Sequence, residues 1–145
     1  MKLRKLNLTD RSLARALFTL MADEFGENHE ALTNDYIDYL LNQLSFWAIA
    51  AITDDGIVGG ITAHTLPMTR TMSSEILVYD IAVRSDHRRS GVGRLLLTDL
   101  RAKAAQAGIG VVFVPVDNDD VGALDFYRAI GGIASPVTIF TFAKP

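Results

Sequence analysis

The sequence predicts a single α/β domain over residues 1–145, of the α+β type, with helices flanking a central mixed, mostly antiparallel β-sheet. One observation is a hairpin signal over 46–66, in which the turn Asp54-Asp55-Gly56 separates two apolar runs. Another is the helical spacing of apolar residues over 91–107. A third is the near-continuous, β-branched run over 109–116, which is typical of a strand covered on both faces.

The first half of the chain supplies three elements before the hairpin. Polar and apolar residues alternate over 2–6, which predicts a short strand. Thr9-Asp10 offers an N-cap to a helix that runs to Phe25-Gly26. Asn34 or Asp35 offers a cap to a second, shorter helix that runs to Leu44.

The second half of the chain continues with a strand over 75–83, an Arg-rich loop, and the helix that Gly108 ends. After the strand over 109–116, a short helix over 123–130 stops at Gly131-Gly132, and the apolar segment 137–142 predicts a last strand. The expected order is therefore β-α-α-β-β-β-α-β-α-β.

Composition limits the classes of function. The net charge of -3 argues against nucleic-acid binding, and no apolar run approaches the roughly 18 residues that a membrane span needs. The N-terminus lacks the apolar stretch of a secretory signal, so a cytoplasmic protein is expected. The absence of cysteine excludes disulfides, thiolate metal sites and a cysteine nucleophile.

Charge is segregated along the chain. No Lys or Arg occurs between Ala16 and Thr69, where there are eight acids, whereas Arg and Lys dominate from Arg84 to Lys103. We expect one half to attract a cation and the other a polyanion, with two solvated faces as the simpler interpretation. The acids are Asp23, Glu24, Glu27, Glu30, Asp35, Asp38, Asp54 and Asp55.

The loop Arg88-Arg89-Ser90-Gly91-Val92-Gly93 lies where a predicted strand passes into a helix. A helix N-terminus presents unpaired N–H groups and a partial positive charge, and glycine lets a phosphate approach the backbone. The glycines alone would equally serve a tight turn. Neither the P-loop pattern nor the dinucleotide fingerprint is present.

Two motifs in this order resemble the GNAT N-acetyltransferase superfamily. Asp80-Ile81-Ala82-Val83 followed by the Arg88–Gly93 loop is similar to its acetyl-CoA motif, Gln/Arg-x-x-Gly-x-Gly/Ala. The segment 123–132 is similar to its later A-x-x-F/L-Y-x-x-x-G-F segment, although Gly132 replaces the aromatic residue and position 120 is Asp instead of Asn. The resemblance implies a GNAT fold and acetyl-CoA as cofactor.

The same resemblance implies which residues hold the cofactor. Backbone groups after Asp80 are expected to bind the pantetheine arm and the thioester carbonyl, and N–H groups of the loop to bind the pyrophosphate. The cofactor-binding residues are then Ile81, Ala82, Val83, Arg88, Arg89, Ser90, Gly91, Val92, Gly93, Arg94 and Phe126.

The first half and the acidic segment 117–120 resemble the type I aminoglycoside 3-N-acetyltransferases, which inactivate gentamicin-class antibiotics. An aminoglycoside is a polycation, and each exposed charge contact is worth about 0.2–1 kcal/mol, so several carboxylates must act together. Glu24 and Glu27, spaced i and i+3, would face one ligand or simply be solvated. The expected substrate-binding residues are Glu24, Glu27, His29, Asp80, Asp117, Asp119 and Asp120.

Two residues are candidates for the chemistry. Asp80 would accept the proton of the attacking ammonium, directly or through water, or only orient the amine. Tyr127 matches the superfamily tyrosine that donates a proton or hydrogen bond to the CoA sulfur. His29 is an alternative base. Tyr79 is expected in the core, on the opposite face from Asp80, unless a bulge redirects it.

Alternatives to this function remain open. One is a GNAT enzyme for another amine, such as a polyamine, an amino acid or a protein N-terminus, and another is a CoA-binding module without catalysis. No metal is expected, because no two histidines have metal-ligand spacing with carboxylates. The apolar segment 137–142 would permit a homodimer.

Overall fold

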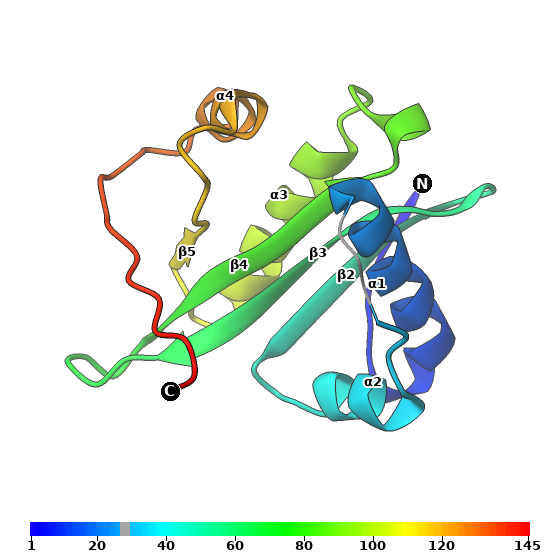
Figure 1. Ribbon diagram of the computed structural model, residues 1–145, viewed down its shortest axis with the longest axis horizontal. Helices are drawn as coiled ribbons and strands as arrows, with labels where there is room; N and C mark the ends of the chain where they lie inside the picture. The colour runs from blue at the N-terminus through cyan, green and yellow to red at the C-terminus, as the bar shows by residue number, and fades with distance from the viewer. Residues whose placement is uncertain (27–29) are drawn as a thin grey trace. The chain divides into compact units, whose positions relative to one another are not determined.

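The computed structural model describes residues 1–26 and 30–145. The predictions for Glu27 and His29 therefore lie outside the described residues. The chain forms two compact units, Met1–Pro115 and Val116–Pro145, which are described here one at a time (Figure 1).

The first unit contains all five strands and three of the four α-helices of the described chain. Its sheet has the order β1-β2-β3-β4-β5, antiparallel throughout except for the parallel pair β4 and β5. This confirms the predicted mixed, mostly antiparallel sheet. In chain order the elements are β1 (Lys2–Lys5), η1 (Leu8–Asp10), α1 (Arg11–Phe25), α2 (Asn34–Leu41), β2 (Phe46–Thr53), β3 (Gly56–Pro67), β4 (Ser74–Val83), η2 (Ser85–His87), α3 (Val92–Gln106) and β5 (Val111–Phe113).

Helices cover both faces of this sheet. On one face, α3 buries Leu96, Leu100 and Ala104 against strand residues such as Ile49 and Ile61. On the other face lie α1 and α2 (Figure 1), whose buried side chains include Leu17 and Ile37. The alternation of inward side chains along each strand thus supplies two cores, one on each side of the sheet.

Glycine allows α1 to pack directly on β3. A Cβ added at Gly60 would lie 2.2 Å from Leu17 Cδ1 and 2.9 Å from the Ile49 carbonyl oxygen. Leu17 is fully buried at this contact. Any side chain at position 60 would therefore push α1 away from the sheet.

Asp10, one of the two predicted residues, is the N-cap of α1, but its side chain makes no capping bond there. It belongs instead to a capping box at the start of η1, which leads into α1. The Asn7 side chain accepts a hydrogen bond from Thr9 N at 2.9 Å, and Asp10 accepts one from Asn7 N at 2.9 Å. Arg4 also donates to the Asp10 carboxylate at 2.8 Å. Burial acts to raise the pKa of Asp10, but the hydrogen bonds from Arg4 and Asn7 outweigh it and lower that pKa. Thr33, rather than Asn34 or Asp35, caps α2.

The second unit contains α4 (Val121–Ala129), two residues earlier at its start than predicted. The predicted last strand, 137–142, is absent, because residues 132–145 have no regular secondary structure. Its apolar side chains are exposed, from 70% at Ile139 to 90% at Phe142. Alternating apolar residues favour a strand, but a strand forms only where a second strand accepts its hydrogen bonds.

None of the helices in the described ranges is long and apolar enough to cross a membrane.

Candidate active site

The loop after β4 contains two residues in the left-handed region of backbone conformation. Arg89 and Gly91 both have positive φ, 62° and 84°, and Ser90 between them donates its hydroxyl proton to the His87 carbonyl. Residues of alternating hand can turn their N–H groups toward one side and form a concave site for an anion. We therefore call residues Arg89 to Gly91 the nest. Val92, the first residue of α3, is buried and anchors the helix behind this nest.

The nest opens to solvent. Residues 88–91 are exposed, and a Cβ added at Gly91 would meet no atom within 4 Å. A phosphate therefore has room to reach the N–H groups at the start of α3, where the helix dipole also favours negative charge. Arg89 in the left-handed region is unusual for a residue with a side chain, and such strain is often found at functional sites.

Ion pairs hold the segment that leads into the nest. Arg84 donates to Asp86 at 2.7 Å, and the His87 ring lies between Asp86 and Asp55, with N–O distances of 3.0 and 3.3 Å. The hydrogen bonds from Arg84 and then from His87 hold the pKa of Asp86 well below its ordinary value. Because Asp55 belongs to the β2–β3 turn, this turn and η2 are linked.

The strands β4 and β5 part before β4 reaches its end at Val83. Their parallel pairing ends at Leu77 and Phe113, whereas β4 continues to Val83 along β3. A cavity of about 190 Å³ opens where they separate, and it is lined by Leu77, Val78, Tyr79 and Pro115. The predicted cofactor residues Ile81, Ala82 and Val83 follow on β4, between this cavity and the loop.

A β-bulge places Tyr79 on the same side of the sheet as Asp80. The register of β3 and β4 shifts between Thr62 and Ala63, so that Thr62 pairs with Asp80 and Ala63 with Val78. Val78 and Ile81, on either side of the bulge, both pack in the core under α3. Tyr79 and Asp80 therefore both lie on the opposite side, which α1 covers. Tyr79 is 67% exposed and is therefore not a core residue, in agreement with the alternative that a bulge redirects it.

Tyr79 ends a row of rings that crosses the α1 side of the sheet. Its ring lies edge-on to His64, with centroids 5.9 Å apart, and His64 lies 5.3 Å from Phe46. Phe46 in turn contacts Phe18 of α1 at 6.2 Å. Sequence analysis did not assign this row. The alternation of β3 places His64 opposite to Ala63 and would have located it on this side.

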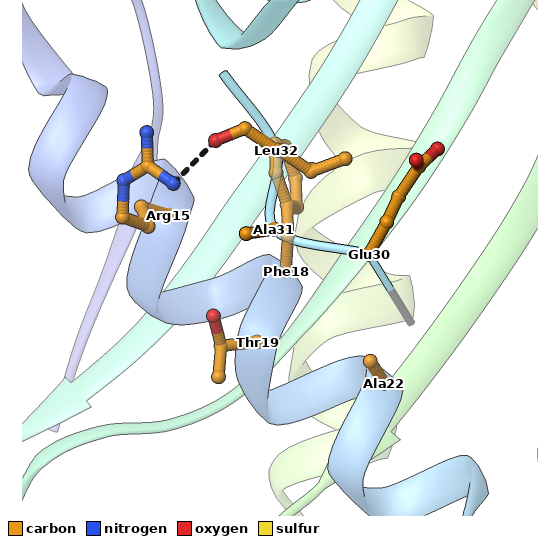
Figure 2. Close-up of a pocket in the computed structure, with 7 residues that line it drawn as sticks. All are labelled: Arg15, Phe18, Thr19, Ala22, Glu30, Ala31 and Leu32. Atoms are coloured by element: carbon orange, nitrogen blue, oxygen red, sulfur yellow. Dashed lines mark hydrogen bonds between the residues drawn. The ribbon is translucent and has the colours of Figure 1, made fainter. Parts of the chain in front are cut away.

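A second cavity, of about 470 Å³, lies at the other end of the row (Figure 2). Arg15 spans its edge and donates to the Leu32 carbonyl at 2.6 Å and to Asn34 Oδ1 at 2.7 Å. Its lining residues are Arg15, Phe18, Thr19, Ala22, Glu30, Ala31 and Leu32. The aromatic row thus connects this cavity to the one where β4 and β5 part.

The acid-only stretch of the sequence is partly neutralised in space. Asp38 accepts from Arg11 Nε at 2.8 Å, which lowers the pKa of Asp38. Asp55 lies beside His87, and Glu24 accepts from Arg88 Nη2 at 2.6 Å. The acidic residues of this stretch are separated from basic residues in the sequence, but several of them lie next to basic residues in the folded protein.

The predicted site residues of the second unit lie in α4 and in the segment just before it. The Asp120 carboxylate caps the helix by accepting from Ala123 N at 3.1 Å, and the Asp117 carbonyl accepts from Asp120 N. The Phe126 and Tyr127 rings meet edge-to-face, with centroids 5.0 Å apart. Of the predicted acids here, Asp120 thus has a structural role in addition to any contact with substrate.

The mixed sheet with helices on both faces is the fold of an acetyltransferase class, and sequence comparison gives the family. Residues 14–131 match the model of the acetyltransferase (GNAT) family, so the chain belongs to this family, whose members use acetyl-CoA.

Solved structures agree with this assignment. The chain superposes on the aminoglycoside acetyltransferase meta-AAC0020 from an uncultured soil metagenomic sample with a TM-score of 0.93, at 28% identity over 99% of this chain and 95% of that one. That enzyme has been crystallised with trehalose and with sisomicin. A second aminoglycoside acetyltransferase from such a sample, HMB0005, gives a TM-score of 0.91 at 28% identity, over 99% of this chain and 98% of its own.

A curated relative matches over a shorter stretch. L-ornithine N5-acetyltransferase NATA1 of Arabidopsis thaliana is 39% identical over 54 residues, which are 37% of this chain. The match spans 24% of the plant enzyme, so it concerns only part of that protein.

Proposed function

We propose that this acetyltransferase transfers the acetyl group of acetyl-CoA to the 3-amino group of aminoglycoside antibiotics, and so confers resistance to them. The observation that carries the proposal is the superposition over nearly the whole chain on two aminoglycoside acetyltransferases, one of them crystallised with sisomicin. The 3-amino position follows from the resemblance of the first half to the type I enzymes.

In the proposal, the cofactor binds along the end of β4 and the loop that follows it. The nest of Arg89 to Gly91 and the N-terminus of α3 bind the pyrophosphate, with Arg88 and Arg94 adding positive charge. The pantetheine arm lies where β4 and β5 part, because β4 offers backbone groups there beyond its last pair with β5. Phe126 is a further cofactor contact.

The acceptor lies on the α1 side of the sheet. Asp80 on this side accepts the proton of the substrate ammonium, directly or through water, and the neutral amine attacks the thioester carbonyl carbon. A C–N bond forms as the C–S bond breaks, and Tyr127 gives the leaving sulfur a proton or hydrogen bond. The carboxylates of Glu30, Asp117 and Asp119 add to the field that attracts the polycation.

A second candidate acceptor is an amino acid side-chain amine, which the partial match to an ornithine acetyltransferase favours. The charge of the chain argues for the aminoglycoside. An amino acid brings a carboxylate of its own, which the proposed substrate acids Glu30, Asp117 and Asp119 would repel, whereas an aminoglycoside brings only positive charges.

The test is the release of thiol from acetyl-CoA with sisomicin, gentamicin, fortimicin, spermidine and L-ornithine as acceptors. We expect turnover with the aminoglycosides, and acetylation at the 3-amino group when the product is examined by NMR. Turnover with only ornithine or only spermidine would show that the acceptor is that amine and not an aminoglycoside. CoA binding without turnover of any acceptor would indicate a binding module.

A further inference from the structure

Glu24, at the end of α1, contacts the loop that follows β4. Its Oε2 accepts a hydrogen bond from Arg88 Nη2 at 2.6 Å, and its Oε1 accepts one from the backbone N–H of Ser85 at 3.3 Å. Arg88 also donates from Nε to the carbonyl of Val83 at 3.2 Å. The Glu24 carboxylate thus links the end of α1 to Ser85 and Arg88, which lie near the two ends of the segment between β4 and the nest.

The burial of Glu24 distinguishes this contact from an ordinary surface ion pair. An exposed pair contributes little to stability, because water and salt screen it. The Glu24 side chain is only 17% exposed, although that of Arg88 is 56% exposed. A shielded carboxylate with two donors favours one arrangement of those donors.

The same contacts engage both carboxylate oxygens of Glu24. A carboxylate that binds a cationic substrate must offer that substrate its oxygens, and both oxygens of Glu24 already accept hydrogen bonds from this chain. The expectation of Glu24 as a substrate ligand came from its place in the acid-only stretch. Its place in the fold is beside the predicted pyrophosphate loop.

We propose that Glu24 is a positioning residue for the cofactor loop, acting through Arg88 and Ser85 to hold the nest in the shape that binds pyrophosphate. This rests on the proposed use of acetyl-CoA, but not on the identity of the acceptor. Pre-forming the loop lowers the entropy that the ligand must otherwise remove when it binds.

The experiment compares Glu24→Gln and Glu24→Ala with the matched control Glu75→Gln, which makes the same chemical change at the opposite end of β4. Calorimetry measures the Kd of CoA. Steady-state kinetics compares acetyl-CoA with S-acetylpantetheine, which lacks the pyrophosphate. We expect Glu24→Ala to weaken CoA binding about 3- to 10-fold, equivalent to losing one or two ordinary hydrogen bonds. Glu24→Gln, which can still accept from Ser85, should lie between Glu24→Ala and the wild type.

The kinetic comparison separates positioning from general damage to the fold. If Glu24 acts on the pyrophosphate loop, its variants lose kcat/KM with acetyl-CoA and retain it with S-acetylpantetheine, at unchanged acceptor KM. Equal loss with both donors would mean that the role is structural. A raised acceptor KM with unchanged Kd for CoA would make Glu24 a substrate ligand, and tighter CoA binding would mean that it competes with phosphate for Arg88. Each of these results overturns the proposal.

The calorimetric test of Glu24 does not depend on which acceptor the enzyme uses. If none of the aminoglycosides is acetylated but CoA binds, the Kd series still decides the role of Glu24. If CoA itself does not bind to the wild-type chain, the use of this cofactor is refuted and the positioning role falls with it.

Discussion

Tyr79 and Asp80 are neighbours in the chain and lie on the same side of the sheet, because a β-bulge at this point of β4 breaks the alternation of side chains. Bulges often redirect a side chain next to an active site. Here the bulge places an exposed ring next to the candidate base, at the end of the row formed with His64, Phe46 and Phe18.

The first prediction concerns this ring. Tyr79→Ala should raise the KM of the aminoglycoside about 3- to 10-fold, because an aromatic contact contributes about 0.5–1.5 kcal/mol beyond its buried area. Tyr79→Phe keeps the ring and should stay close to the wild type. Steady-state kinetics with both substrates is the measurement. A raised KM for acetyl-CoA at constant acceptor KM would assign the ring to the cofactor instead.

The second prediction concerns Asp80 as general base. Asp80→Asn keeps the size of the side chain but cannot take a proton, so kcat should fall by about 10²–10⁴ with little change in KM. The rate of the variant should recover as the pH approaches the pKa of the substrate amine, since the amine then loses its proton to solvent. An unchanged kcat would leave Asp80 with a binding role alone.

The third prediction concerns Tyr127. Tyr127→Phe removes the hydroxyl and keeps the ring that packs on Phe126, so kcat should fall roughly tenfold or more while the Kd of CoA stays within about a factor of two. Stopped-flow measurement of product formation and calorimetry with CoA give the two values. Parallel loss of both would show that the hydroxyl supports the structure of α4 rather than the leaving sulfur.

The fourth prediction concerns stability and pH at Asp10. Its pKa in the folded state is lowered from the ordinary 3.8, so its carboxylate stabilises the fold above that pH and ceases to do so as the pH falls through the lower, folded value. Asp10→Asn should reduce the free energy of unfolding by about 1 kcal/mol at neutral pH, through loss of the charged contact with Arg4.

Urea denaturation at neutral pH and at about pH 3 measures this difference, which should shrink at the lower pH. Asp35→Asn in the exposed first turn of α2 is the matched control, with an expected effect of a few tenths of a kcal/mol. A difference that stays constant with pH would mean that the charge of Asp10 does not contribute.

Local patterns predicted most of the fold. The hairpin around Gly56 and the start of α3 at Val92 depend on residues a few positions apart, and the structure confirms both. The bulge at Tyr79 depends on the pairing of β4 with β3, which no pattern within β4 records. The segment 137–142 has the right alternation but pairs with none of the five described strands.

The contacts of the candidate site were harder to predict for the same reason. The loop at Gly91 could be found because its glycines and the helix behind it are adjacent in sequence. The contact of Glu24 with Arg88 joins residues 64 positions apart, and only the packing of α1 on the sheet creates it. Charge along the chain therefore assigned Glu24 to the substrate, whereas its spatial neighbours belong to the cofactor loop.

The β2–β3 turn has a practical consequence for engineering this enzyme. An exposed hairpin tip is normally a good place to insert a tag or a fluorescent reporter. Asp55 at this tip, however, accepts Arg84 Nη1 on its carbonyl at 3.4 Å and faces His87, so an insertion there would disturb the segment that leads into the nest. The tip between β3 and β4, where Met72 is fully exposed, has no such link to that segment and is the better site for an insertion.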